Sequence, residues 1–180
     1  VGSNSRASGE NAQAFGDRAV ASGQSSFSAG ANSQATKTNS VAIGTGSSST
    51  NTSTLALGTI ASASGYQSTA IGFNANASAK DSVAVGAQSF ANAENTIAFG
   101  TSAKATADAA MAFGRESEAS ALDSIAFGFN SIANKVNSTA IGSSSKATGL
   151  QSIAFGTLAI GSGTDSIAIG YRSSAVDRDS

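Results

Sequence analysis

Large apolar and small residues alternate in short runs that return at a fixed interval along the chain. In the segment 40–44, Val41 and Ile43 are large and apolar, whereas Ser40 and Ala42 are small. The same order returns in the segments Ser82-Val83-Ala84-Val85-Gly86 and Ser124-Ile125-Ala126-Phe127-Gly128. An alternation with a period of two is typical of a β-strand whose two faces differ. We therefore predict a short strand in each of these segments.

A glycine follows each predicted strand, and successive glycines are always 14 residues apart. Such a fixed period is the signature of a repeat architecture in which each repeat stacks on its neighbours. The pattern predicts a solenoid of about 13 coils in one domain over residues 1–180. The glycines are Gly2, Gly16, Gly30, Gly44, Gly58, Gly72, Gly86, Gly100, Gly114, Gly128, Gly142, Gly156 and Gly170.

A second alternation follows each glycine and predicts a second strand in every coil. The third and fifth residues after the glycine are almost always Ser or Ala, as in Ala61 and Ala63, and a variable residue such as Ser62 lies between them. One tight turn contains the two residues after the glycine. The other lies at positions such as Lys80-Asp81, where Asn, Asp and Gln recur and can bond nearby backbone groups. Stacked coils then form two parallel sheets that face each other.

The small residues of both strands are predicted to face the inside of the coil, because a 14-residue coil cannot enclose larger ones. Charge supports this assignment, since none of the charged residues falls in the glycine column, in the best-kept small columns or in the two large apolar columns. The alternative is that the large apolar residues form the core and the small ones face outward. That arrangement leaves an exposed face of Ala, Ser and Gly with almost no charge.

With the small residues inside, the large apolar columns form one continuous outward stripe from Val1 onward, interrupted at Gln13, Ala29, Thr69 and Thr139. Soluble monomers rarely expose an apolar patch of this size, so we expect association. Closed symmetry is the usual outcome, but these columns do not choose between two-fold and three-fold assembly. The predicted interface residues are Val41, Ile43, Leu55, Leu57, Ile71, Val83, Val85, Ile97, Phe99, Met111, Phe113, Ile125, Phe127, Ile141, Ile153, Phe155, Ile167 and Ile169.

Composition removes several classes of function. The chain has no His or Cys, so neither a Ser-His nor a Cys-His nucleophile pair can form, and the commonest transition-metal ligands are missing. The carboxylates of Asp81, Asp123 and Asp165 share one turn column, but they are three coils apart, about 14 Å, which is too far for a paired acid and base. We expect no catalytic residues, no metal and no cofactor. The net charge of −1 gives no reason to expect nucleic acid or an anionic membrane as a partner.

The motif Asn39-Ser40-Val41-Ala42-Ile43-Gly44, repeated as Asp81-Ser82-Val83-Ala84-Val85-Gly86 and Asp165-Ser166-Ile167-Ala168-Ile169-Gly170, resembles the head repeats of YadA-like trimeric autotransporter adhesins. The resemblance covers essentially the whole chain. It implies a left-handed parallel β-roll and a parallel homotrimer joined through the apolar columns. It also implies display on the bacterial cell surface above a stalk and an outer-membrane anchor. The basic neck motif, stalk heptads and anchor of that family have no counterpart here, so we expect a fragment of a longer protein.

The resemblance implies adhesion to host extracellular-matrix proteins (collagen, fibronectin or laminin), adhesion to cell-surface receptors, or autoaggregation. Exposed aromatic and Arg side chains are favoured contact residues. An alternative is that these side chains cap turns or fill grooves. A second class of function is a rigid spacer or fibre segment without its own ligand. A flat ice-binding face is disfavoured because its threonine column is broken by Ser and Asn residues. The candidate ligand contacts are Tyr66, Phe73, Phe90, Phe129, Tyr171 and Arg172.

Overall fold

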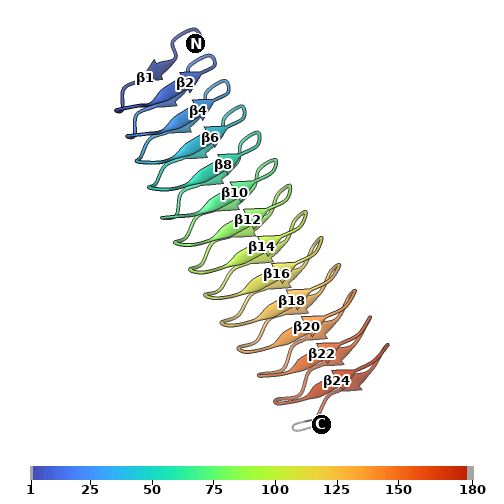
Figure 1. The fold of residues 1–180 in the computed structure, drawn as a ribbon. Helices are drawn as coiled ribbons and strands as arrows, with labels where there is room; N and C mark the ends of the chain where they lie inside the picture. The colour runs from blue at the N-terminus through green and yellow to red at the C-terminus, as the bar shows by residue number, and fades with distance from the viewer. Residues whose placement is uncertain (1, 178–180) are drawn as a thin grey trace. The chain divides into compact units, whose positions relative to one another are not determined.

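The computed structural model describes residues 2–177, which form an all-β parallel β-solenoid with 14-residue coils (Figure 1). Each strand pairs in parallel with the equivalent strand of the next coil, so that Val41 lies beside Leu55 and Ala42 beside Ala56. The chain divides into two compact units, Val1–Ser89 and Phe90–Ser180, and each is described by itself. The described residues contain no helix, and therefore none that could span a membrane.

Each coil contributes one two-residue strand to a sheet that we call sheet A and one three-residue strand to a second sheet, sheet B. In unit 1 the sheet A strands stack in chain order, as do the sheet B strands. Sheet A of unit 1 contains β1 (Arg6–Ala7), β3 (Val20–Ala21), β5 (Gln34–Ala35), β7 (Ser48–Ser49), β9 (Ser62–Ala63) and β11 (Asn76–Ala77). Sheet B of unit 1 contains β2 (Gln13–Phe15), β4 (Phe27–Ala29), β6 (Val41–Ile43), β8 (Leu55–Leu57), β10 (Thr69–Ile71) and β12 (Val83–Val85).

Unit 2 repeats this arrangement with the same parallel register. Sheet A of unit 2 contains β13 (Phe90–Ala91), β15 (Lys104–Ala105), β17 (Glu118–Ala119), β19 (Ile132–Ala133), β21 (Lys146–Ala147), β23 (Ile160–Gly161) and β25 (Ser174–Ala175). Sheet B of unit 2 contains β14 (Ile97–Phe99), β16 (Met111–Phe113), β18 (Ile125–Phe127), β20 (Thr139–Ile141), β22 (Ile153–Phe155) and β24 (Ile167–Ile169).

The core of each unit is a layer of small side chains between the two sheets. Ala42 of β6 and Ala63 of β9 are fully buried, and so are Ser40 and Ser47, which flank the strands. The described residues that are buried in this way are Ala, Ser, Thr and Gly, and no larger side chain is among them. The prediction that the small residues face inward is confirmed, and the alternative with the large apolar residues inside is wrong. The reason is the circumference of the coil, which leaves no room between the sheets for a side chain larger than that of Thr.

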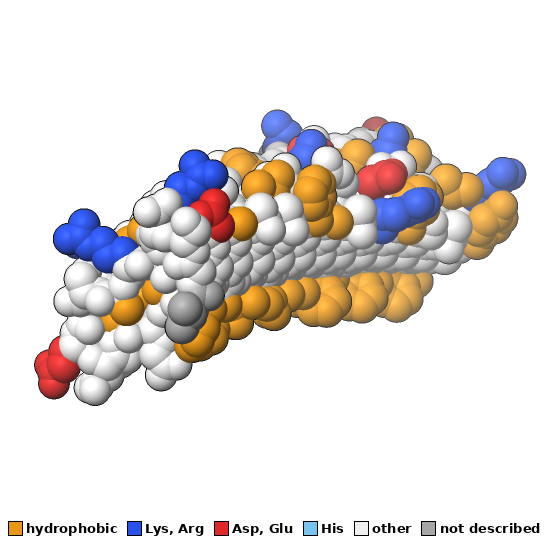
Figure 2. Space-filling model, turned by 90° about the horizontal axis from the view of Figure 1, so that it is seen from above, with side chains coloured by type: hydrophobic (Ala, Val, Ile, Leu, Met, Phe, Trp, Pro, Cys, Tyr) orange, Lys and Arg blue, Asp and Glu red, His pale blue; other side chains and the backbone are white. Residues whose placement is uncertain are grey.

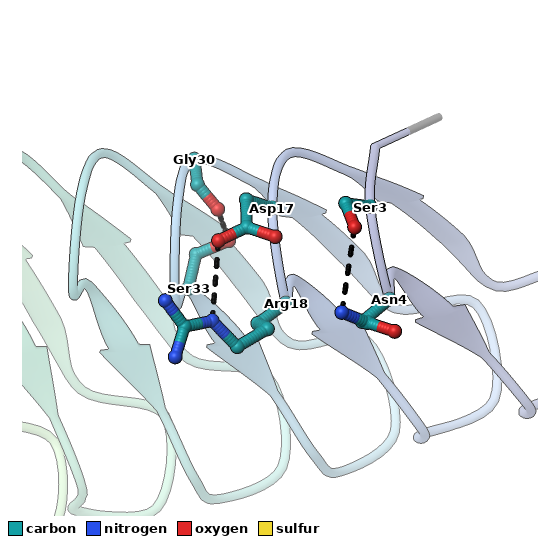
Figure 3. A network of polar contacts seen from close by, with 6 residues as sticks. All are labelled: Ser3, Asn4, Asp17, Arg18, Gly30 and Ser33. Atoms are coloured by element: carbon teal, nitrogen blue, oxygen red, sulfur yellow. Dashed lines mark hydrogen bonds and ion pairs between the residues drawn. The ribbon is translucent and has the colours of Figure 1, made fainter.

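Both turns of a coil are closed by the same hydrogen-bond pattern, and a serine often reinforces it. In the first turn the backbone N–H of Ser33 donates to the carbonyl of Gly30 at 3.2 Å, and the Ser33 hydroxyl donates to the same oxygen at 2.8 Å (Figure 3). In the second turn Ser68 makes both bonds to the carbonyl of Gly65. These bonds satisfy buried hydroxyls and turn carbonyls together.

The residue before each turn-closing serine, threonine or alanine adopts a left-handed conformation, with φ between 51° and 65° in the described coils. Asn and Asp tolerate this region better than other residues, and they often hold this position, as at Asn39 and Asp81. We had expected their side chains to bond the backbone, but the serine hydroxyls carry most of the side-chain bonds in these turns. The turn columns are therefore enriched in Asn and Asp because these residues tolerate the left-handed backbone conformation.

Ile60 is a poor fit to its turn, because a β-branched residue at φ 54° is strained. Its side chain is 45% exposed and contributes little to the core. The substitution Ile60→Asn is expected to raise the free energy of unfolding by about 1 kcal/mol. Urea denaturation monitored by circular dichroism measures the change. Asn74→Ile, one coil further along the same column at φ 53°, is expected to lower it by a similar amount. Equal stability of the three proteins would contradict the prediction.

Candidate functional surfaces

The outward side chains of sheet B form a surface that we call the apolar face. Since alternate residues of a strand point to opposite sides, burying Ala126 places Ile125 and Phe127 outside. Phe127 is 55% exposed and Ile169 is 69% exposed. Figure 2 shows hydrophobic side chains gathered in a row from which the Lys, Arg, Asp and Glu side chains are absent. All 18 predicted interface residues lie on this face, half-buried or exposed. Val1, the predicted start of the stripe, lies outside the described residues.

The apolar face differs in chemistry between the two units. In unit 1 most of its side chains are aliphatic, as in β6 and β8. In unit 2 phenylalanines stack on one another along the column before the glycine, with ring centroids 6.3 Å apart for Phe99 and Phe113 and 5.8 Å apart for Phe113 and Phe127. Coil stacking therefore buries part of each ring, and the outer part remains uncovered within the chain.

The six candidate ligand contacts do not form one cluster. Phe73, Phe129 and Tyr171 occupy the first turn of their coils and are exposed, and Arg172 is exposed beside Tyr171. Tyr66 is exposed on the second turn, at the opposite edge of the coil. Phe90 lies on the outward side of β13 in sheet A. Its side chain is half-buried and not exposed, so the expectation that it is exposed was wrong. Its neighbour in the next coil, Lys104, flanks it in register.

An aromatic–cation pair on the first-turn edge of unit 2 was not predicted from the sequence. The Arg115 guanidinium lies over the Phe129 ring at 4.4 Å from its centroid, and it also approaches the carboxylate of Glu116 at 3.9 Å. Arg172 lies over Tyr171 in the same way at 5.2 Å. The available signal was the 14-residue spacing, which places Arg115 one coil before Phe129 in the same column. This edge presents a planar cation and an aromatic ring together, the side chains that protein partners most often engage.

A second apolar feature that the sequence analysis missed lies on the second-turn edge of unit 2. Leu122, Val136 and Leu150 occupy the same turn position in three consecutive coils, and Leu122 is 47% exposed. The backbone N–H of Asn137 donates to the carbonyl of Leu122, and that of Gln151 to the carbonyl of Val136. These bonds place the three residues one above another along the edge of unit 2. No enclosed pocket and no cluster of potential metal ligands occurs among the residues that the structure describes.

These features define a class of protein: a parallel β-solenoid with a core of small residues and an uncovered apolar face along one sheet. The family model of the YadA head domain repeat, which spans two copies of the repeat, matches residues 1–26, 21–47, 49–75, 77–103, 105–131, 133–159 and 162–180. The chain belongs to the YadA head family.

A solved structure agrees with this assignment. The chain is 34% identical to the collagen-binding domain of the Yersinia adhesin YadA, and the two structures align with a TM-score of 0.57. The alignment covers 65% of this chain and 65% of the Yersinia chain. No curated protein matches the sequence.

Proposed function

We propose that this chain is the head of a trimeric autotransporter adhesin, a parallel homotrimer of left-handed β-rolls displayed on the bacterial cell surface by an outer-membrane anchor. The observation that carries the proposal is the run of YadA head repeats across the chain, from residue 1 to residue 180. The uncovered apolar face supports it, because the same face is needed to hold the chains together.

Burial of the apolar face supplies the driving force for trimerisation. Covering one large apolar side chain is worth about 1.5–3 kcal/mol when the side chain is fully exposed at first. The side chains of this face are already half-buried to exposed in the single chain, so covering each of them in the trimer contributes only a fraction of that free energy. Summed over two columns of consecutive coils, this gain is what offsets the entropy that association costs. Three parallel chains around one axis cover the face of every copy equally.

The adhesive contacts then lie on the edges and on sheet A, which the trimer leaves free. Collagen is the first ligand to test because the Yersinia relative is a collagen-binding domain. Fibronectin, laminin and a second head, in autoaggregation, are further candidates. Repetition gives each head many weak contacts in a row, and trimerisation multiplies them.

The experiment has two parts. Light scattering gives the oligomeric mass of the purified chain, where a trimer is expected and a stable monomer overturns the proposal. Solid-phase binding of that trimer to immobilised collagen, fibronectin and laminin tests adhesion, and saturable binding to collagen is expected. A trimer that binds none of these proteins and no host cell supports a rigid spacer.

The Arg115–Phe129 pair offers a matched test of the ligand contacts. Phe129→Ala is expected to weaken collagen binding about tenfold, because an exposed aromatic contact is replaced by a methyl group. Phe129 is 41% exposed, so the fold and the trimer mass remain unchanged. Thr157→Ala, at an exposed site in the same turn column, is the control and retains full affinity. Unchanged binding by the Phe129 variant would exclude this edge from the collagen site.

A further inference from the structure

Two threonines interrupt the apolar face at half-buried positions of sheet B. Thr69 begins β10 and lies in register between Leu55 and Val83. Thr139 begins β20 and lies between Ile125 and Ile153. Their hydroxyls therefore point out of the coil into surroundings that are otherwise apolar.

The hydroxyls of Thr69 and Thr139 make no hydrogen bond within the described part of the chain. The inward-facing threonines differ, since the hydroxyl of Thr54 donates to the carbonyl of Asn51 at 2.6 Å and that of Thr96 to the carbonyl of Ala93 at 2.6 Å. In the single chain the two outward hydroxyls are accessible to water. Covering them with an apolar surface removes that water and leaves a polar group without a partner, which costs free energy.

From these observations we infer that Thr69 and Thr139 set the register in which copies of this chain associate. In a parallel assembly without offset, each threonine meets its own copies, and the hydroxyls can bond one another. An offset of one coil places Thr69 opposite Leu55 or Val83, where no partner exists. This inference rests on the proposed trimer and adds the residues that fix its alignment.

The spacing of the polar interruptions makes this alignment unique. Gln13 precedes Thr69 by four coils, and Thr69 precedes Thr139 by five coils. Because the two intervals differ, a parallel assembly without offset places all three interruptions opposite their own copies. Any other offset places at most one interruption of one chain opposite an interruption of the next chain. A single buried polar residue is known to fix register in the same way in coiled coils. Glycine and small-residue columns repeat identically in every coil and cannot supply this information.

The register can be read from distances between spin labels, because the chain has no native cysteine. Chains carrying a nitroxide at Thr101→Cys are mixed with chains carrying a gadolinium chelate at Thr157→Cys before assembly, so that only distances between the two kinds of chain are measured. Both sites are exposed in the first-turn column of unit 2 and lie four coils apart. An offset of one coil moves one label relative to the other by about 4.8 Å along the solenoid. Pulsed electron paramagnetic resonance resolves that change.

For the parent sequence we expect one narrow distance distribution. The variant Thr69→Val, Thr139→Val is expected to melt at a higher temperature yet to show additional longer and shorter distances, since both half-buried polar interruptions are then removed and Gln13, which remains on the apolar face, is exposed. Thr69→Ser, Thr139→Ser retains the hydroxyls and is expected to restore the single distribution. Thr45→Val, Thr59→Val, on the exposed first-turn edge, is the control for two threonine-to-valine changes.

Two results overturn the inference. A valine variant that keeps the single distribution shows that the threonines do not set the register. A parent assembly with several distances shows that no register is set at all. A monomeric parent chain is a different failure, because it overturns the proposed function first and is recognised from the mass alone.

Discussion

The substitution Gly128→Ala is expected to unfold the coils around it, with a loss of at least about 3 kcal/mol in the free energy of unfolding. A Cβ atom at Gly128 would lie 2.5 Å from the carbonyl oxygen of Gly142 and 2.7 Å from its carbonyl carbon. That backbone cannot move aside, because the N–H of Gly142 donates to the carbonyl of Phe127 at 2.8 Å within the ladder. The φ angle of 138° adds strain for any residue with a side chain.

Gly170→Ala is the matched control, because it separates backbone strain from steric collision. Gly170 has a φ angle of 118°, but no atom of the described residues other than its two chain neighbours lies within 4 Å of its added Cβ. Its substitution is expected to cost only the strain, about 1–2 kcal/mol. Urea denaturation of both variants gives the two values. Equal losses would show that contact between coils does not explain the glycine column.

The sequence predicted the coil correctly because its strongest signals come from steric limits that every coil shares. Glycine is required where two backbones approach, and only Ala, Ser and Thr fit between the sheets, so Gly44 and Ala42 have equivalents in almost every coil. Period, strand positions, parallel pairing and the inward faces all follow from these two limits. The predictions of a left-handed roll and of a trimer came from resemblance, and a single chain does not display the contacts between copies that a trimer requires.

The surface was less predictable, because outward positions obey no common limit. Phe90 was expected to be exposed, but a side chain on the outward side of a sheet is partly covered by its neighbours in adjacent coils. Leu122 and Arg115 lie in columns that also hold charged, polar and small residues, so a column-by-column comparison does not single them out. They become visible only when adjacent coils are considered together. The left-handed conformation of Ile60 was not predicted either, because isoleucine is a poor indicator of a turn.

The second large effect concerns assembly: Ile125→Glu is expected to convert the proposed trimer into a folded monomer. Ile125 points out of β18 and is half-buried, so the single chain tolerates a carboxylate there in contact with water. In the trimer three such carboxylates would be removed from water and brought near one another. An unpaired buried charge costs several kcal/mol, and each copy contributes one.

Ile132→Glu supplies the control, because Ile132 is also half-buried and points outward, but from β19 in sheet A. Its neighbours in register are Glu118 and Lys146, so charge is already present on that face. Light scattering at neutral pH is expected to give a monomer mass for Ile125→Glu and a trimer mass for Ile132→Glu, with the circular dichroism of both unchanged. Acidification below the ordinary glutamate pKa of about 4.3 is expected to return the Ile125 variant to the trimer, since the neutral carboxyl is far less costly to bury. A trimer mass for Ile125→Glu at neutral pH would place the interface on another surface, and the apolar face would then need a different partner.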